Sequence, residues 1–161
     1  VRDCIVGKDT TINASQVNES TIGSHTTVGP FTYVRPNCCI GDHCRVGDFV
    51  EVKNSVIGDG TKISHLTYVG DSDVGQRVNF GCGTVTTNYD GHKKHRCTIG
   101  DDVFLGCNTN LIAPVTVADR AYTAAGSTVT DDVPEGALAI ARQRQTNIRG
   151  WADRLRKTWK K

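Results

Sequence analysis

The chain has 161 residues, of which 37% are hydrophobic and 22% are charged, and its formal net charge is +2. This length suits a single domain, and the composition excludes both an intrinsically disordered chain and a membrane-spanning segment. Val, Ile and Thr outnumber Leu and Ala about three to one. Because β-branched residues favour strands, this ratio also excludes a helical bundle.

Aliphatic residues recur every six positions along most of the chain, and Gly often follows them, as in Ile22-Gly23 and Val46-Gly47. This period fits neither an amphipathic α-helix nor simple strand alternation. It fits short strands joined by tight turns, in which three hexads close one triangular coil and the aliphatic side chains point inward. The sequence therefore predicts an all-β solenoid of about seven coils. The clearest inward positions are Ile22, Val28, Val34, Ile40, Val46, Val52, Ile99, Leu105, Leu111, Val117 and Val129.

Two basic residues, Arg35 and Lys53, each follow an inward aliphatic residue and lie 18 positions apart, which is one full coil. We expect their backbones to lie about 5 Å apart on adjacent coils. Two cations at that distance repel each other, so an anion, most often a phosphate, would stabilise the pair. The alternative is that both side chains extend into water, where the repulsion is weak.

His65 lies just past the inward Ile63 and is either a structural or a catalytic histidine. The step from Thr86 to Ile99 is 13 residues long where six are expected, which predicts a protruding loop over residues 87–98. The loop contains His92 and His95, but their spacing does not match a metal site and we predict no metal.

The last 20 residues contain eight Lys or Arg and one Asp, which leaves 11 basic and 16 acidic residues in the rest of the chain. We therefore divide the chain into a β-helix domain over residues 1–141 and a basic C-terminal tail over residues 142–161. An acidic body repels a phosphate backbone, so we expect no nucleic-acid partner. Trp151, Leu155 and Trp159 would form one apolar stripe if the tail were helical.

Seven cysteines without a CxxC pair indicate reduced thiols. The first residues show no apolar segment of a signal peptide. We therefore expect a cytoplasmic location and no membrane partner.

Three segments are more specific than the repeat: Ser64–Asp71, Val78–Thr84 and Asn88–Gly91. They resemble the C-terminal acetyltransferase domain of the bacterial bifunctional N-acetylglucosamine-1-phosphate uridylyltransferases/glucosamine-1-phosphate acetyltransferases, which are hexapeptide-repeat transferases. The resemblance implies a left-handed parallel β-helix and a homotrimer. It also implies acetyl transfer from acetyl-CoA to the 2-amino group of glucosamine 1-phosphate, for UDP-N-acetylglucosamine and cell-wall synthesis. An N-terminal uridylyltransferase domain would belong to the parent protein and is not part of this sequence.

The resemblance also implies a role for each residue that matches a motif of the family. His65 would be the general base. The sugar-phosphate ligands would be Arg35, Lys53, Tyr68 and Lys94, and the residues that hold the sugar would be Asn79, Asn88 and Tyr89. Acetyl-CoA would contact Cys82, Cys107, Ala125 and Arg142, the last across a subunit boundary. The chain departs from the family at Cys107, where Ser is usual, and at Gln143-Arg144, where an apolar residue and a proline are usual.

Three other functions compete with this one. The first is an acyltransferase for another amino sugar or amino acid, which gives no reason to stack Arg35 and Lys53. The second is a hydration enzyme of the carbonic-anhydrase type, which needs three histidines around zinc. The third is an inactive module that only assembles an upstream enzyme domain.

Overall fold

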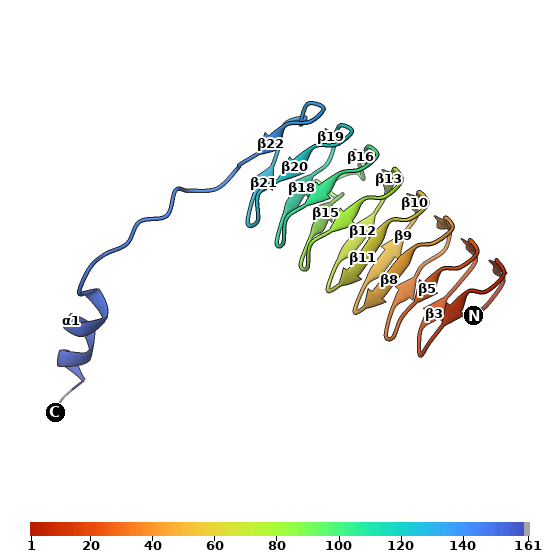
Figure 1. Ribbon diagram of the computed structural model, residues 1–161, viewed down its shortest axis with the longest axis horizontal. Helices are drawn as coiled ribbons and strands as arrows, with labels where there is room; N and C mark the ends of the chain where they lie inside the picture. The colour runs from red at the N-terminus through yellow and green to blue at the C-terminus, as the bar shows by residue number, and fades with distance from the viewer. Residues whose placement is uncertain (160–161) are drawn as a thin grey trace.

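The computed structural model describes residues 1–159 and shows a long parallel β-solenoid, then an extended segment and one short helix (Figure 1). Each turn contributes one short strand to each of three sheets, so the solenoid is a three-sided prism. Within every sheet each strand pairs in parallel with the strand one turn before and one turn after it. The predicted all-β solenoid is confirmed.

The strands are two to four residues long because each face of the prism holds only part of one hexad. The first sheet consists of β1 (Ile5–Val6), β4 (Thr21–Ile22), β7 (Cys39–Ile40), β10 (Val56–Ile57), β13 (Ser72–Val74), β16 (Cys97–Ile99) and β19 (Val115–Val117). The second consists of β2 (Thr11–Ile12), β5 (Thr27–Val28), β8 (Arg45–Asp48), β11 (Lys62–His65), β14 (Asn79–Phe80), β17 (Phe104–Leu105), β20 (Tyr122–Thr123) and β22 (Leu138–Ala139). The third consists of β3 (Gln16–Val17), β6 (Tyr33–Val34), β9 (Glu51–Lys53), β12 (Tyr68–Gly70), β15 (Val85–Thr87), β18 (Asn110–Ile112) and β21 (Thr128–Val129).

The second sheet has eight strands, so the solenoid has about eight turns where the repeat predicted about seven. The difference arises at the start of the chain. The hexad series becomes clear only at Ile22, but β1, β2 and β3 already form a complete turn before that residue.

One aliphatic side chain from each typical strand points into the prism, and every inward position predicted from the hexads is buried. Fully burying a Val, Leu or Ile side chain stabilises a fold by about 1.5–3 kcal/mol. Stacked aliphatic layers therefore hold the turns together.

The corners of the prism use backbone with positive φ, at residues such as His25 (φ 55°) and His43 (φ 56°). Residues at equivalent corners superpose from one turn to the next. The rings of His25 and His43 consequently stack with centroids 4.9 Å apart.

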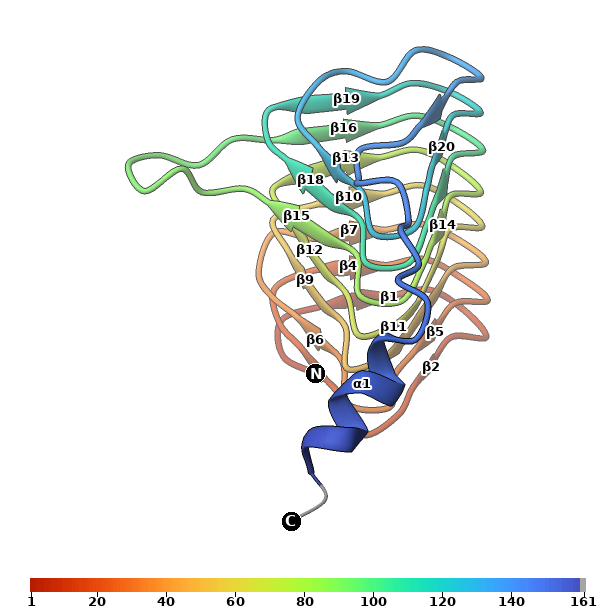
Figure 2. The same ribbon diagram turned by 90° about the vertical axis from the view of Figure 1, so that its left-hand side faces the viewer.

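The predicted loop is present between β15 and β16 and projects sideways from the prism (Figure 2). Tyr89 and Lys94 form an antiparallel bridge at its base. Because the strands on either side keep their register with the next turn, the loop is added without disturbing the solenoid.

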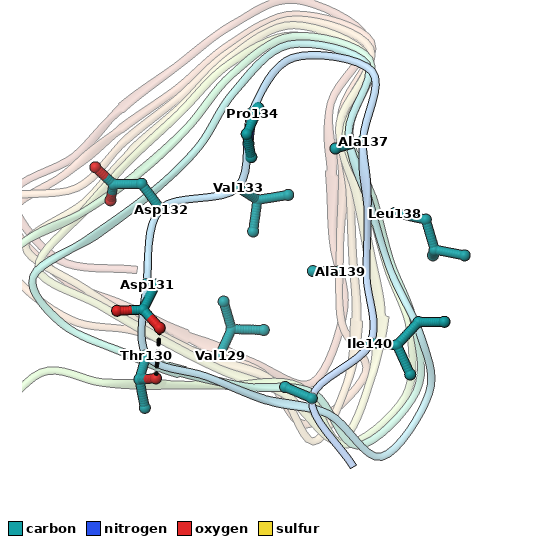
Figure 3. Close-up of a pocket in the computed structure, with 11 residues that line it drawn as sticks. Val129, Thr130, Asp131, Asp132, Val133, Pro134, Ala137, Leu138, Ala139 and Ile140 are labelled. Carbon is teal, nitrogen blue, oxygen red and sulfur yellow. Dashed lines mark hydrogen bonds between the residues drawn. The ribbon is translucent and has the colours of Figure 1, made fainter. Parts of the chain in front are cut away.

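The final turn is open at its end, where Val129, Val133, Ala137 and Ala139 line a pocket of about 260 Å³ (Figure 3). The chain then runs through exposed residues 140–150 to α1 (Trp151–Thr158), which stands apart from the solenoid (Figure 1). The predicted helical stripe is thus present, and α1 buries none of its residues. In the described part of the chain, no helix is long and apolar enough to cross a membrane.

Candidate active site

A cationic pocket of about 390 Å³ lies at the corner that follows the third sheet. Three basic side chains, one carboxylate and two amides supply most of its polar groups. Its lining residues are Arg35, Pro36, Asn37, Lys53, Asn54, Asp71 and Lys94. The structure therefore brings three of the predicted sugar-phosphate ligands together in one hollow.

Strand register explains why Arg35 and Lys53 are neighbours. Val34 of β6 pairs with Val52 of β9, so the next residue on each strand lies side by side with the other. Each cation also has an acidic partner that the sequence did not reveal. Arg35 Nη1 donates to Glu51 Oε1 at 3.0 Å, and Lys53 Nζ donates to Asp71 Oδ2 at 3.1 Å.

Asp71 is the structural centre of this corner, and its side chain is only 6% exposed. Besides Lys53, its carboxylate accepts hydrogen bonds from Asn54 Nδ2 at 2.6 Å and from Asn88 Nδ2 at 2.5 Å. Burial works to raise the pKa of the Asp71 carboxyl, but these hydrogen bonds outweigh it and hold that pKa below its usual value. Asp71 is therefore an anion that fixes Lys53 and the start of the loop.

Lys94 comes from the base of the loop and faces Lys53 across the pocket. The hydrogen-bonding and Coulomb effects of the Lys53 ammonium lower the pKa of Lys94 from its usual 10.5. Burial of the Lys53 ammonium lowers its pKa, but the carboxylate of Asp71 raises the pKa by more. The pKa of Lys53 therefore lies above its ordinary value. Two ammonium groups held this close favour binding of an anion between them.

The loop that carries Lys94 is held by Asp90. Its Oδ1 accepts the backbone N–H groups of His92 at 2.8 Å and Lys93 at 2.7 Å, and its Oδ2 lies 2.7 Å from His95 Nε2. The backbone N–H of Lys93 and the ring of His95 contribute most to lowering the pKa of Asp90 well below its usual value. Asp90 is therefore an organising centre for the predicted loop.

Tyr68 lies on the outer face of the third sheet and reaches the same network, since Asn88 Nδ2 donates to its hydroxyl at 3.3 Å. Gly70 makes this possible, because a Cβ at that position would overlap both the Tyr68 hydroxyl and the Asn88 amide. The glycine of the Ser64–Asp71 motif thus leaves room for two predicted ligands to meet.

His65 ends β11 at the opposite edge of the third face, where the chain turns from the second sheet to the third. Its Nδ1 lies 2.8 Å from Asp48 Oδ1, which belongs to the preceding turn. This hydrogen bond lowers the pKa of the Asp48 carboxyl. With its proton on Nδ1, the imidazole donates to Asp48 and presents Nε2 as a proton acceptor on a half-exposed side chain.

The residues predicted to contact acetyl-CoA lie on the same edge of the prism as Asp48 and His65, each about one turn after the one before it. We call this column of stacked residues the ladder. The register of β14 with β17 places Cys82 beside Cys107, and the N–H of Asn108 donates to Cys82 O at 2.8 Å. One turn later the N–H of Gly126 donates to Cys107 O, also at 2.8 Å, which places Ala125 next in the series. The side chain of Arg142 passes beside Gly126. All four predicted residues therefore follow one edge of the prism.

Two predicted sugar ligands lie outside these groups. Asn79 faces outward from β14 on the second sheet, around the corner from the third face. Tyr89 is exposed in the loop, where its hydroxyl donates to Gly91 O at 2.8 Å. The structure therefore does not bring these two side chains to the cationic pocket within a single chain.

Sequence reasoning missed three acidic residues: Asp48, Glu51 and Asp71. The signal for Asp71 was present, because it lies 18 positions after Lys53, the same one-coil spacing that linked Lys53 to Arg35. Asp48 lies 17 positions before His65, which is also one coil. Among residues 1–159, no three His, Cys, Asp or Glu side chains gather as metal ligands would.

Comparison with protein families finds a match to the bacterial transferase hexapeptide family over residues 19–54 and 96–131. Together with the parallel solenoid, this repeat indicates a left-handed β-helix. Two solved structures share the fold alone. A UDP-N-acetylglucosamine acyltransferase from Campylobacter jejuni aligns with a TM-score of 0.56 and 16% identity, over 98% of this chain and 79% of its own. A perosamine N-acetyltransferase from Caulobacter crescentus, in complex with CoA and GDP-perosamine, aligns with a TM-score of 0.53 and 23% identity, over 78% and 54%.

Curated relatives are much closer in sequence. The bifunctional protein GlmU of Oceanobacillus iheyensis is 62% identical over 157 residues, which are 98% of this chain and 34% of that protein. GlmU of Clostridium perfringens is 60% identical over 149 residues, which are 92% of this chain and 33% of that protein. The chain thus spans about a third of the length of these relatives.

Proposed function

Since the chain belongs to the bacterial hexapeptide-repeat transferases and matches GlmU proteins closely, we propose that it transfers an acetyl group from acetyl-CoA to the 2-amino group of glucosamine 1-phosphate. The product, N-acetylglucosamine 1-phosphate, would serve UDP-N-acetylglucosamine and cell-wall synthesis. One observation carries the proposal. The third face of the prism has a three-cation pocket at one edge and an imidazole, hydrogen-bonded to a carboxylate, at the other.

The cationic pocket suits the phosphate of the acceptor. Arg35, Lys53 and Lys94 supply positively charged donors, and Asp71 keeps Lys53 in place and protonated. A phosphate between Lys53 and Lys94 would also relieve the repulsion of their ammonium groups. The sugar ring would then lie along the third face toward His65, past the hydroxyl of Tyr68 and the amide of Asn88.

His65 would act as the general base. An amine attacks a thioester only as the free base, and the proton on the 2-amino nitrogen must leave as the new C–N bond forms. Nε2 of His65 accepts this proton, and Asp48 stabilises the resulting imidazolium through Nδ1. The backbone N–H of Cys82 makes no hydrogen bond within residues 1–159, so it is available to the oxyanion that develops on the acetyl carbonyl.

The ladder of Cys82, Cys107, Ala125 and Arg142 would hold the donor. Four turns at about 4.8 Å each separate His65 from the level of Arg142, a distance of roughly 19 Å that suits an elongated acyl carrier. The thioester end would lie at Cys82, next to His65, and the guanidinium of Arg142 would pair with a phosphate at the far end. Acetyl-CoA supplies the activated acetyl group there.

Several features of the whole protein belong to the same proposal. The chain matches about a third of each GlmU protein, so the parent protein would carry an N-terminal uridylyltransferase domain. Asn79 and Tyr89, which lie away from the pocket of their own chain, would reach the site of a neighbouring chain in a homotrimer. Seven free thiols support a reducing, cytoplasmic location. The β-helix domain would be residues 1–141 and the basic tail residues 142–161.

A thiol-release assay tests the function. Acetyl-CoA and glucosamine 1-phosphate should release CoA thiol, whereas plain glucosamine at the same concentration should react far more slowly because it lacks the phosphate. Equal rates with both acceptors would contradict the phosphate pocket. Absence of turnover with either acceptor would favour a module that only assembles its parent protein.

The substitution Arg35→Ala separates the two substrates. It should raise the KM for glucosamine 1-phosphate and leave the KM for acetyl-CoA near the wild-type value, because Arg35 lies in the anion pocket and far from the Cys82 ladder. Arg45→Ala is a matched control, since this arginine lies in β8 outside the pocket lining. Equal losses of affinity for both substrates would contradict the assignment of Arg35.

A further inference from the structure

Cys82 and Cys107 lie one turn apart on the ladder that also contains His65. Phe80 of β14 pairs with Leu105 of β17, and Cys82 and Cys107 follow two residues later on their respective strands. The backbone N–H of Cys107 lies so close to Gly81 that a Cβ there would overlap it. Cys82 and Cys107 therefore occupy equivalent positions on adjacent turns of the solenoid.

Side chains at equivalent positions of adjacent turns touch at several places in this protein. One rung earlier on the same ladder, Asp48 Oδ1 and His65 Nδ1 are 2.8 Å apart. On the second sheet, the rings of Phe104 and Tyr122 stack with centroids 5.2 Å apart. The Cα atoms of register partners on neighbouring strands lie about 4.8 Å apart, which is within the Cα range of roughly 4.4–6.8 Å that a disulfide requires.

The other five cysteines differ from this pair. Cys38, Cys44 and Cys97 are buried, and burial raises the pKa of the Cys97 thiol to about 11, so it stays protonated and unreactive. Cys39 is exposed, but its register partners are Thr21 and Val56. Cys4, the fifth, belongs to the first turn. In the described chain, residues 1–159, Cys82 and Cys107 are thus the two accessible thiols on neighbouring rungs.

We propose that Cys82 and Cys107 form an oxidisable dithiol, a modification site that reacts with peroxides and is restored by small thiols. The thiolate of one cysteine attacks a peroxide oxygen, the O–O bond breaks, and the departing hydroxide takes a proton to become water. The second thiolate then attacks the resulting sulfenic sulfur, so that an S–S bond forms and the S–O bond breaks. That hydroxide also leaves as water, and two electrons have passed from the thiols to the peroxide.

The consequence for catalysis rests on the proposed function. The disulfide would join the two turns that lie between His65 and Ala125 on the ladder. The thioester end of acetyl-CoA would lie there. Oxidation would therefore stop acetyl transfer by closing the donor side of the site, while the cationic pocket at the other edge of the third face would stay open.

Mass spectrometry tests the modification without any assay of activity. The reduced full chain is treated with hydrogen peroxide, the remaining thiols are blocked with iodoacetamide, and the protein is digested with trypsin. Oxidation should link fragment 78–93 to fragment 97–120, with the loss of two hydrogen atoms. Cys82→Ser and Cys107→Ser should each abolish the link, and Cys39→Ser, a control on another face, should retain it. Sulfinic acid at either cysteine without the link would overturn the proposal.

Activity tests the consequence, with each variant compared with its own fully reduced rate. Wild type and Cys39→Ser should lose most of their acetyl transfer on oxidation and regain it with dithiothreitol, whereas Cys107→Ser should lose little. A linked but fully active protein would show that the disulfide does not close the donor site. If the reduced protein transfers no acetyl group at all, the proposed function fails, and the fragment linkage still decides whether the dithiol exists.

Discussion

At the scale of single residues, the site depends on acidic partners that hold basic groups in place. Asp71 fixes Lys53, Glu51 fixes Arg35, and Asp48 fixes His65. Each pair joins residues from adjacent turns. The prism therefore positions its polar groups by the same stacking that positions its aliphatic core.

The Asp48–His65 pair predicts a graded response to substitution. His65→Ala removes the base and should lower kcat by roughly 10²–10⁴-fold. Asp48→Asn keeps a hydrogen-bonding side chain but removes the charge that stabilises the imidazolium, so we expect a smaller loss of kcat than in His65→Ala. The thiol-release rate measures both effects, and circular dichroism confirms that each variant is folded. Near-wild-type turnover in His65→Ala would refute the base.

Lys94 predicts how sugar-phosphate binding depends on pH. Lys53 lowers the pKa of Lys94 below 10.5, so Lys94 loses its proton at a lower pH than an ordinary lysine. The affinity for glucosamine 1-phosphate should therefore be highest where Lys94 is charged and should fall as the pH rises through its pKa.

Calorimetric titrations over a series of alkaline pH values check this expectation. Lys94→Arg provides the comparison, because a guanidinium stays protonated throughout and should flatten the profile. An identical decline in the arginine variant would assign the pH dependence to another group.

At the scale of elements, the hexad period was enough to predict the strands, their inward residues and the loop. It predicted these features because burial repeats at a fixed interval along the chain. The same spacing also placed Arg35 beside Lys53. It did not identify their carboxylate partners, because a long side chain selects its partner by reach and rotamer as well as by register. Arg35, for example, pairs with Glu51, which lies 16 residues away and not 18.

The proposed acceptor site requires the loop between β15 and β16 to be ordered. Asp90→Ala removes the acceptor of two backbone N–H groups and of the His95 ring, so the loop should lose its fixed shape. Because Asn88 and Lys94 stand at its base, the KM for glucosamine 1-phosphate should rise several-fold while the KM for acetyl-CoA changes little.

Steady-state kinetics with each substrate varied in turn measure this effect. Asp131→Ala offers a control at an exposed acidic residue in the last turn, far from the loop. A rise in both KM values would indicate a defect of the whole solenoid and not of the loop.

At the scale of the molecule, a single chain leaves several large apolar side chains exposed. α1 exposes Trp151 and Leu155, Trp159 is exposed just after its end, and the second sheet exposes Phe104 and Tyr122 near its end. The sequence predicted an apolar stripe only on the condition that the tail is helical, and it did not predict where the tail lies relative to the solenoid. That arrangement depends on tertiary contacts, which a periodic pattern does not encode.

The proposed homotrimer predicts the molecular mass in solution and a dependence of specific activity on protein concentration. Light scattering should give about three times the 17.4 kDa of the chain. If neighbouring chains supply Asn79 and Tyr89, specific activity should fall on dilution to concentrations where the oligomer dissociates. A monomer with undiminished specific activity would show that one chain suffices.

The arrangement of turns also has a consequence for how the molecule comes apart. Within each sheet every strand pairs only with strands of the turn before and the turn after it, so loosening spreads along a line and starts where one neighbour is missing. The rungs that carry Asp48, His65, Lys53 and Asp71 lie away from both ends. Fraying from the N-terminal end must therefore loosen the outer turns before it reaches these four residues.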